Sequence, residues 1–123
     1  MRATLLVCAV AAAAACKGSF GTPPYAAVQT GGNPDRGEEV IRARRCGACH
    51  LIPGVRGAHG VVAPPLTQFA LRTYIGGEVP NTPQNLVRWI RDPHEIEPRT
   101  AMPNLGLSEI EARDVAAYLY TLR

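Results

Sequence analysis

The stretch Cys46-Gly47-Ala48-Cys49-His50 decides how this chain of 123 residues is interpreted. It places two thiols on one side of a helical turn, and a histidine follows directly after the second thiol. This spacing lets both thiols bond to the two vinyl groups on one edge of a porphyrin, and it sets the imidazole under the iron. The pattern therefore predicts one covalently bound c-type haem, held by Cys46 and Cys49, with His50 as an axial ligand.

Two other uses of the motif compete with this prediction. A thioredoxin-like redox pair belongs in a βαβ unit, and this chain has no strand pattern that predicts one. Half of a zinc site needs two further ligands, and the only other cysteines, Cys8 and Cys16, lie at the start of the chain. Four cysteines in a short exported chain first suggest disulfides, but the haem prediction implies that no structural disulfide forms.

A second axial ligand for the iron has to come from another part of the chain. Met102 is the only methionine after the initiator, and its neighbours in the loop 100–104 are polar or helix-breaking, which argues against a role in core packing. We therefore expect His50 and Met102 to be the two metal ligands. His59 and His94 are the alternatives: His59 follows His50 closely in a Gly-rich loop, and His94 is expected on the surface.

Three helices are predicted from their N-terminal signals, which are a capping residue followed by proline or a capping box. These signals are Asn33-Pro34, Thr82-Pro83 and Ser108-Glu109-Ile110-Glu111. Apolar residues at helical spacing follow each signal and predict helices over residues 34–45, 83–92 and 109–122.

A fourth helix is expected over residues 66–75, where Pro64-Pro65 precedes apolar residues at helical spacing and Gly76-Gly77 follows. No run of alternating apolar and polar residues is long enough to predict a strand. The segments 51–63 and 92–107 are expected to be long loops, which in a small domain usually carry function. The fold class predicted is all-α, with four short helices around the haem.

The start of the chain is expected to direct export rather than to join the fold. Met1-Arg2 precedes an apolar run, Leu5–Ala15, which is shorter than the roughly 20 residues that span a bilayer. These features predict a signal peptide over residues 1–15. Ala13-Ala14-Ala15-Cys16 resembles a bacterial lipobox, so we expect a lipid on Cys16, with ordinary cleavage and an incidental cysteine as the alternative.

Such a lipid would tether the protein to the outer face of the bacterial cytoplasmic membrane, and ordinary cleavage would release it into the periplasm. Residues 16–33 contain Gly-Ser, Gly-Thr-Pro-Pro and Gly-Gly and are expected to form a flexible tether. Residues 34–123 are expected to be the folded domain. A domain this small needs a staple or a bulky cofactor, and the haem would supply it.

Composition restricts the classes of function. The formal net charge is +3, from 13 basic and 10 acidic residues, which is too weak a balance to predict a nucleic-acid binder. This weak charge leads us to expect no nucleic acid among the partners. Hydrophobic residues make up 46% of the chain, which is enough for a globular core.

Residues 34–123 resemble a small monohaem class I cytochrome c. The resemblance is carried by the Cys46–His50 motif, the segment Ala63-Pro64-Pro65-Leu66, the methionine loop and the last helix. The stretch 81–106 is similar to the cytochrome c domain of subunit II in some haem-copper oxidases, and to free cytochromes associated with terminal oxidases. The resemblance implies the cytochrome c fold, in which the N- and C-terminal helices cross. The crossing is implied at four residues: Gly37, Ile41, Tyr118 and Leu119.

The same resemblance implies roles for three residues around the haem. The carbonyl of Pro64 would accept a hydrogen bond from the His50 ring and strengthen its bond to iron. Trp89 would face the haem near Met102, and Thr100 would lie near a haem propionate.

The function implied is one-electron transfer by a carrier that is not itself an enzyme, since both axial positions are filled by protein. Its partners would be redox proteins, with a terminal oxidase as acceptor and a quinol-oxidising complex as possible donor, and it would be a monomer. Two alternatives stay open. One is a haem peroxidase or gas-binding protein with a labile sixth ligand, and the other is a fixed subunit of an oxidase or dehydrogenase complex.

Overall fold

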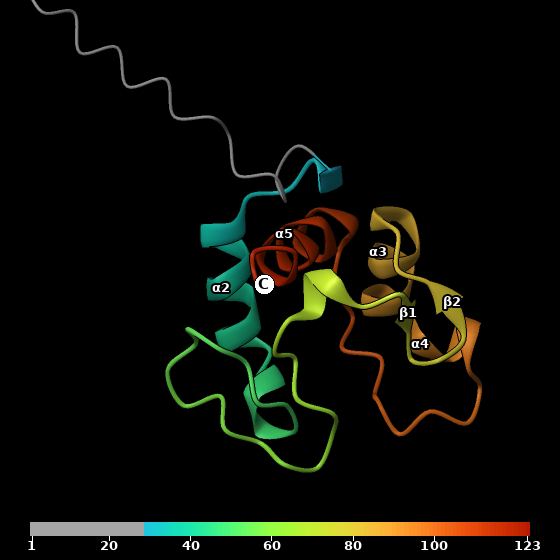
Figure 1. The fold of residues 1–123 in the computed structure, drawn as a ribbon, viewed down its shortest axis with the longest axis horizontal. Helices are drawn as coiled ribbons and strands as arrows, with labels where there is room; N and C mark the ends of the chain where they lie inside the picture. Colours follow the sequence, from blue (N-terminus) through green and yellow to red (C-terminus); the bar gives the residue numbers. More distant parts are fainter. Residues whose placement is uncertain (1–28) are drawn as a thin grey trace, which may run out of the picture.

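A computed structural model of the chain describes residues 29–123, and the predicted signal peptide and Cys16 lie outside this range (Figure 1). Four helices make up most of the regular structure: α2 (Pro34–Ala43), α3 (Pro83–Arg91), α4 (Pro93–Ile96) and α5 (Glu109–Leu119). Two short strands, β1 (Tyr74–Ile75) and β2 (Val79–Pro80), pair antiparallel. Within the described residues, no helix is both long and apolar enough to cross a bilayer. The mainly helical architecture confirms the predicted fold class.

The caps predicted from the sequence are present at the start of α2, α3 and α5. The side chains of Asn33 and Thr82 each accept a backbone N–H from three residues further on, at 3.0 and 3.2 Å. Ser108 and Glu111 form the reciprocal capping box: Ser108 Oγ accepts the Glu111 N–H at 3.2 Å, and Glu111 Oε2 accepts the Ser108 N–H at 2.8 Å. These local bonds explain why the helix starts were predictable. Their ends come earlier than expected, at Ala43 for α2 and Leu119 for α5.

α5 lies between α2 and α3, and its contact with α2 is the most extensive between any two elements (Figure 1). Gly37 of α2 sits at the point of closest approach. A Cβ at that position would lie 2.1 Å from the carbonyl oxygen of Asp114 and 3.0 Å from Cβ of Tyr118. The absence of a side chain therefore lets the two backbones meet. The implied crossing of the first and last helices is confirmed.

Gly37→Ala should lower the free energy of unfolding by about 3 kcal/mol. The added methyl group would clash with the backbone of Asp114, which cannot relieve the clash by changing rotamer as a side chain could. Denaturant unfolding of the holoprotein measures this loss. Glu39→Ala, on the exposed side of the same helix, is the control and should change stability by less than about 0.5 kcal/mol. Equal stability of the Gly37→Ala variant and the wild type would contradict the close approach.

The prediction of a helix over residues 66–75 is wrong. The segment instead contains a short 3₁₀ turn that begins at Phe69, followed by strand β1. The side-chain amide of Asn81 donates to the carbonyls of Phe69 and Arg72 at 3.1 and 3.0 Å, and its Oδ1 accepts the Tyr120 hydroxyl at 2.9 Å. Long-range hydrogen bonds thus engage carbonyls that a continuous helix would bond locally. They outweigh the local apolar spacing that suggested a helix.

Two further elements differ from the expectations. β1 and β2 form a small hairpin where no strand was predicted, and its turn uses Gly76 and Gly77 with φ of 60° and 82°. The segment 92–107 is not entirely a loop, because α4 begins within it. The Asp92 carboxylate accepts the N–H of His94 at 3.2 Å and caps this helix. The Asp-Pro pair is the same kind of signal that marks the other helix starts and would have predicted α4.

The last residues of the predicted tether, 16–33, lie against α5. Thr30 is only 1% exposed, and its carbonyl accepts a hydrogen bond from Arg113 Nη1 at 2.9 Å. A Cβ on Gly32 would lie 2.1 Å from the Arg113 carbonyl oxygen. The folded part therefore extends N-terminal to the boundary that the sequence predicted at residue 34.

Asp114 is a nearly buried carboxylate that joins this segment to α5, with only 5% of its side chain exposed. It accepts the Asn33 N–H at 2.7 Å and two bonds from the Arg36 guanidinium at 2.8 and 3.0 Å. Burial alone would raise the pKa of Asp114, but the hydrogen bonds and charge of Arg36 and the bond from Asn33 outweigh it. The pKa is therefore lower than its ordinary value.

Because the folded pKa of Asp114 is depressed, its contribution to stability is complete above the unfolded pKa of about 3.9 and is lost as pH falls through the folded value. Asp114→Asn should lower the free energy of unfolding at pH 7 by about 2 kcal/mol, since an amide cannot accept both bonds from Arg36. Unfolding curves at pH 7, 4 and 3 should show the wild-type protein losing its advantage over this variant. Asp35→Asn, on the exposed surface of α2, should show no such convergence. If the wild-type protein and both variants lost stability equally as the pH falls, the pH dependence could not be assigned to Asp114.

Candidate functional site

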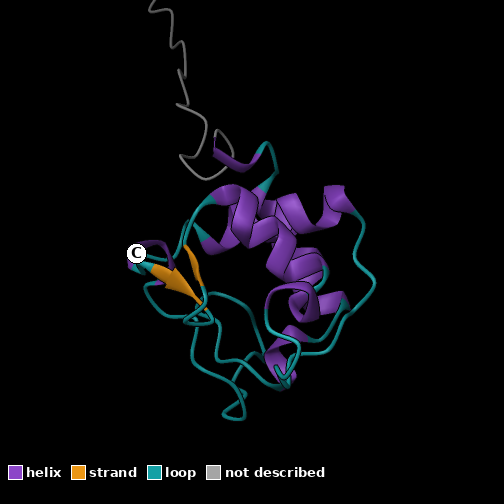
Figure 2. Ribbon diagram, turned by 90° about the vertical axis from the view of Figure 1, so that its right-hand side faces the viewer, coloured by secondary structure: helices purple, strands orange, loops and turns teal. Residues whose placement is uncertain are grey.

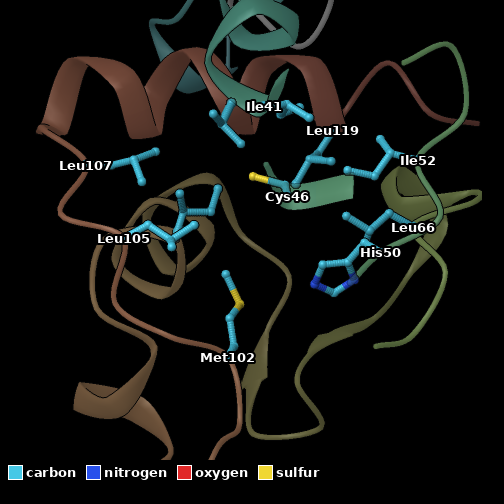
Figure 3. A pocket seen from close by; sticks show the side chains of 11 residues that line it. Ile41, Cys46, His50, Ile52, Leu66, Met102, Leu105, Leu107 and Leu119 are labelled. Atoms are coloured by element: carbon cyan, nitrogen blue, oxygen red, sulfur yellow. The ribbon is translucent and has the colours of Figure 1, made fainter. Parts of the chain in front are cut away.

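An apolar pocket lies under α5 and is closed by residues from α2, α3 and the loop before α5 (Figure 3). About 430 Å³ of space, which includes the open mouth, lies between its walls. The structure brings Cys46, His50 and Met102 together on its walls. The other lining residues are aliphatic: Ile41, Ile52, Leu66, Ile90, Leu105, Leu107, Val115 and Leu119.

The cysteine motif forms a tight turn at the edge of this pocket. Cys46–Ala48 is a 3₁₀ turn, and the Cys46 carbonyl accepts the His50 N–H at 3.0 Å. Cys46 is half-buried and lines the pocket, whereas Cys49 is exposed. A Cβ on Gly47 would lie 2.5 Å from the Cα of Ala58, so the loop after the motif packs directly on the turn. The turn thus presents the first thiol to the pocket and leaves the second exposed, outside the pocket lining.

The environment of the motif is unlike that of a thiol redox site. Burial raises the pKa of the Cys46 thiol, whereas nucleophilic and redox-active thiols have a lowered pKa. Among residues 29–123, no three or more His, Cys, Asp or Glu side chains gather as they would around a metal such as zinc.

His50 is oriented by a hydrogen bond from its ring to the chain. Its Nδ1 lies 2.7 Å from the carbonyl oxygen of Pro64, the contact that the resemblance implied. A carbonyl can only accept, so Nδ1 carries the proton and Nε2 keeps a lone pair for a metal. The N–H of Ala63 donates to the Cys49 carbonyl at 2.9 Å, which holds the Pro64 segment beside the motif. The loop after the motif therefore sets both the tautomer and the orientation of the ring.

Met102 enters the pocket from the loop between α4 and α5, and its side chain and that of His50 face the same space (Figure 3). The Met102 N–H donates to Thr100 Oγ1 at 3.2 Å, and the Thr100 N–H donates to the Glu97 carbonyl at 3.0 Å. These successive turns hold the methionine at the pocket. Thr100, which the resemblance placed near a propionate, supports the Met102 backbone here, and the propionate contact stays a prediction.

Arg44 holds the far end of the loop between α4 and α5. This role was not predicted from the sequence. It donates to the Leu105 carbonyl at 3.3 Å and to Glu111 Oε1 at 2.8 Å. The bond from Arg44, with those from Ser108, lowers the pKa of Glu111 to about 2. Arg44 thus joins the end of α2 to both the methionine loop and α5. Its only sequence signal was its position just before the motif, which gave no hint of partners 61 and 67 residues away.

The remaining candidates lie outside the pocket lining. Trp89 is half-buried on α3, and a Cβ on Gly76 would lie 2.6 Å from its indole ring, so the ring packs on the hairpin turn. Its contact with a haem stays a prediction. His59 and His94 are exposed, and neither lines the pocket.

The residues present fit a covalent haem. Cys46 and Cys49 form a Cys-x-x-Cys pair, and an imidazole with a free nitrogen and a thioether face one apolar space beside Cys46. Comparison with protein families matches residues 34–123 to cytochrome c. The chain belongs to the cytochrome c family. The family explains why a small helical domain leaves an apolar pocket at its centre, since in cytochromes c the haem is part of the core.

Relatives of this cytochrome c domain connect it to respiratory oxidases. The chain is 33% identical over 90 residues to cytochrome c oxidase subunit 2 of Alkalihalophilus pseudofirmus, covering 72% of this chain and 25% of the relative. It is 30% identical over 92 residues to the Bacillus subtilis subunit, covering 72% of this chain and 26% of the relative. The chain thus spans about a quarter of the length of the curated relatives it matches. The predicted resemblance to oxidase subunit II is confirmed.

Proposed function

We propose that this cytochrome c is a one-electron carrier whose haem c iron is ligated by His50 and Met102, working outside the cytoplasm in a respiratory chain. The observation that carries the proposal is the pocket in which these two side chains face one apolar space beside Cys46. Nothing else in the described residues combines nitrogen and sulfur donors with so apolar a wall.

Each side chain has a defined part in this proposal. Cys46 and Cys49 hold the haem through thioether bonds, and the bound haem supplies reversible exchange of one electron at iron. His50, with its proton kept on Nδ1 by Pro64, offers Nε2 as a strong donor. The Met102 thioether favours the reduced state relative to a second imidazole. The aliphatic walls exclude water and disfavour the extra positive charge of ferric iron, which raises the reduction potential.

A carrier differs from a haem peroxidase or gas-binding protein in having no open position for a substrate. The absorption spectrum of the purified holoprotein distinguishes them. The ferric protein should show a methionine-to-iron charge-transfer band, and the ferrous protein should bind no carbon monoxide at neutral pH. Rapid carbon monoxide binding would contradict the proposal and favour the enzyme or sensor.

We further propose that a terminal oxidase accepts the electron, because the similar curated proteins are oxidase subunits. The protein would be a monomer, exported to the periplasm or tethered to the outer face of the cytoplasmic membrane by a lipid on Cys16. Mass spectrometry of the mature N-terminus tests the lipid, and an unmodified start would contradict it. Co-purification with an oxidase or dehydrogenase after mild detergent extraction would favour the fixed-subunit alternative over a shuttle.

A further inference from the structure

Two consecutive prolines carry the carbonyl that orients the His50 imidazole. The Pro64 carbonyl accepts the His50 Nδ1–H at 2.7 Å, and Pro65 follows directly. Because proline has no backbone N–H, neither proline can be fixed by a donor of its own. The next donor along the chain is the N–H of Leu66, which donates to the Leu51 carbonyl at 2.8 Å. The orientation of the Pro64 carbonyl therefore depends on groups outside the proline pair.

Arg72 supplies the donor that the proline pair lacks. Its guanidinium donates from Nη2 to the carbonyls of Pro65 and Thr67, the second at 3.3 Å. Among the described residues, this side chain donates to these two carbonyls and pairs with no carboxylate. The peptide plane between Pro65 and Leu66 is thus held from both sides, by Arg72 at its oxygen and by Leu51 at its N–H.

The ring of Pro65 transmits this restraint to the neighbouring peptide. Proline fixes φ at about −65°, so only rotation about ψ of Pro65 lets the plane that carries the Pro64 carbonyl turn relative to the next plane. A proline also restricts the backbone of the residue before it, which here is Pro64. Fixing the Pro65 carbonyl therefore limits how far the Pro64 carbonyl can swing away from His50.

Arg72 is itself held in place by the rest of the fold. It lies just before strand β1, at the end of a connection that is mostly loop (Figure 2). Its guanidinium carbon lies 5.4 Å from the centre of the Phe69 ring, and this buried ring packs edge-on against Tyr120. Asn81 donates to the Arg72 carbonyl at 3.0 Å and accepts the Tyr120 hydroxyl at 2.9 Å. A continuous set of contacts therefore runs from the end of α5 through Arg72 to the Pro65 carbonyl.

We propose that Arg72 is a positioning residue, which keeps the Pro64 carbonyl on the His50 ring by clamping the turn of Pro65 and Thr67. The proposal rests on the proposed ligation of a haem iron by His50. A carbonyl bound to Nδ1–H makes an imidazole a stronger donor to a metal, and a stronger donor favours the ferric state. Arg72 would thus lower the reduction potential through His50, whereas its positive charge alone would raise it. The two effects have opposite signs, so experiment can separate them.

Exchange of the His50 Nδ1 proton with solvent, followed by NMR of the ferrous holoprotein, measures how well the bond to Pro64 is kept. Arg72→Lys retains the positive charge but loses the planar fork that reaches both carbonyls. It should speed this exchange about fivefold, and Arg72→Met should speed it about tenfold. At the wild-type midpoint potential, the ratio of ferric to ferrous Arg72→Lys protein should fall about threefold, an upward shift of about 30 mV for one electron.

The matched controls are Arg88→Lys and Arg88→Met on α3, because Arg88 pairs with the exposed Glu95 at 2.8 Å. They should change the exchange of the His50 proton by less than about twofold. Unchanged exchange in both Arg72 variants would overturn the proposal. So would a wild-type potential in Arg72→Lys together with a lowered potential in Arg72→Met, because charge alone would then be acting. If Arg72→Met fails to fold, Arg72→Lys decides by itself.

Pro65→Ala tests whether the restraint passes through the proline ring. Alanine frees φ at this position, so the variant should speed exchange of the His50 proton about threefold. In that background Arg72→Lys should change the exchange rate by less than about twofold, because the two peptide planes are no longer coupled. Full additivity of the two substitutions would overturn the route through Pro65. Absence of haem ring-current shifts from the His50 ring of the wild-type protein would instead contradict ligation by His50, and with it the proposed function.

Discussion

Replacing Cys49 or His50 with alanine should prevent stable folding of the domain. The pocket is walled by eight aliphatic side chains drawn from α2, α3, α5 and two loops, so a haem bound there would form the centre of this core. Without a firmly attached haem these surfaces meet water, at about 25 cal/mol for each Å² of apolar area left exposed. A domain of this size has little other stabilisation to set against that loss. Far-UV circular dichroism and thermal unfolding should show no cooperative transition.

His59→Ala is the matched control for His50→Ala, because His59 is exposed and lies outside the pocket lining. It should fold and carry haem like the wild-type protein. A purified Cys49→Ala protein that is haem-free and still unfolds cooperatively would refute the prediction. It would show that the helices and loops form a sufficient core by themselves.

Met102→Ala should leave the iron with only one protein ligand. The charge-transfer band of the ferric protein should disappear, and the ferrous protein should bind carbon monoxide. The reduction potential should fall by on the order of 0.1 V, a part of the roughly 0.8 V that axial ligands span. The fold should persist, because the bonds made by Thr100 and Arg44 hold the loop independently of the methionine side chain. Spectroelectrochemistry and carbon monoxide difference spectra measure these changes.

Two substitutions at the same position separate the thioether from its volume. Met102→Leu keeps an apolar side chain of similar size and should behave like Met102→Ala. Met102→His should restore two protein ligands, block carbon monoxide and keep a low potential. An unchanged charge-transfer band in Met102→Ala would contradict Met102 as an iron ligand. If this variant still bound no carbon monoxide, His59 or His94 would be the alternative sixth ligand.

The Cys46–His50 motif, the loop around Met102 and three of the helix starts were predictable because each depends on residues close together in the chain. The spacing of Cys46, Cys49 and His50 is by itself enough to predict haem attachment. The side chains at Asn33, Thr82 and Ser108 bond backbone groups three residues on, so their effect is local. The α4 helix follows the same rule through Asp92, and it was missed only because its signal fell inside a segment interpreted as a loop.

Other features depended on contacts between distant parts of the chain. The segment 66–75 has the apolar spacing of a helix, yet bonds from Asn81, itself held by Tyr120, turn it into a 3₁₀ turn and a strand. The roles of Asp114 and Arg44 come from partners 61 to 81 residues away, and the two looked like ordinary charged residues in the sequence.

The sequence by itself determined the Cys46–His50 motif, the position of the methionine loop and the helical class of the fold, because these follow from short-range spacing and from backbone bonds within one turn. Only the tertiary structure decided which side chains share the pocket with His50 and Met102. The physical reason is that burial and the pairing of charges depend on which segments meet in space. In this chain that meeting depends on the close approach of α2 and α5 at Gly37.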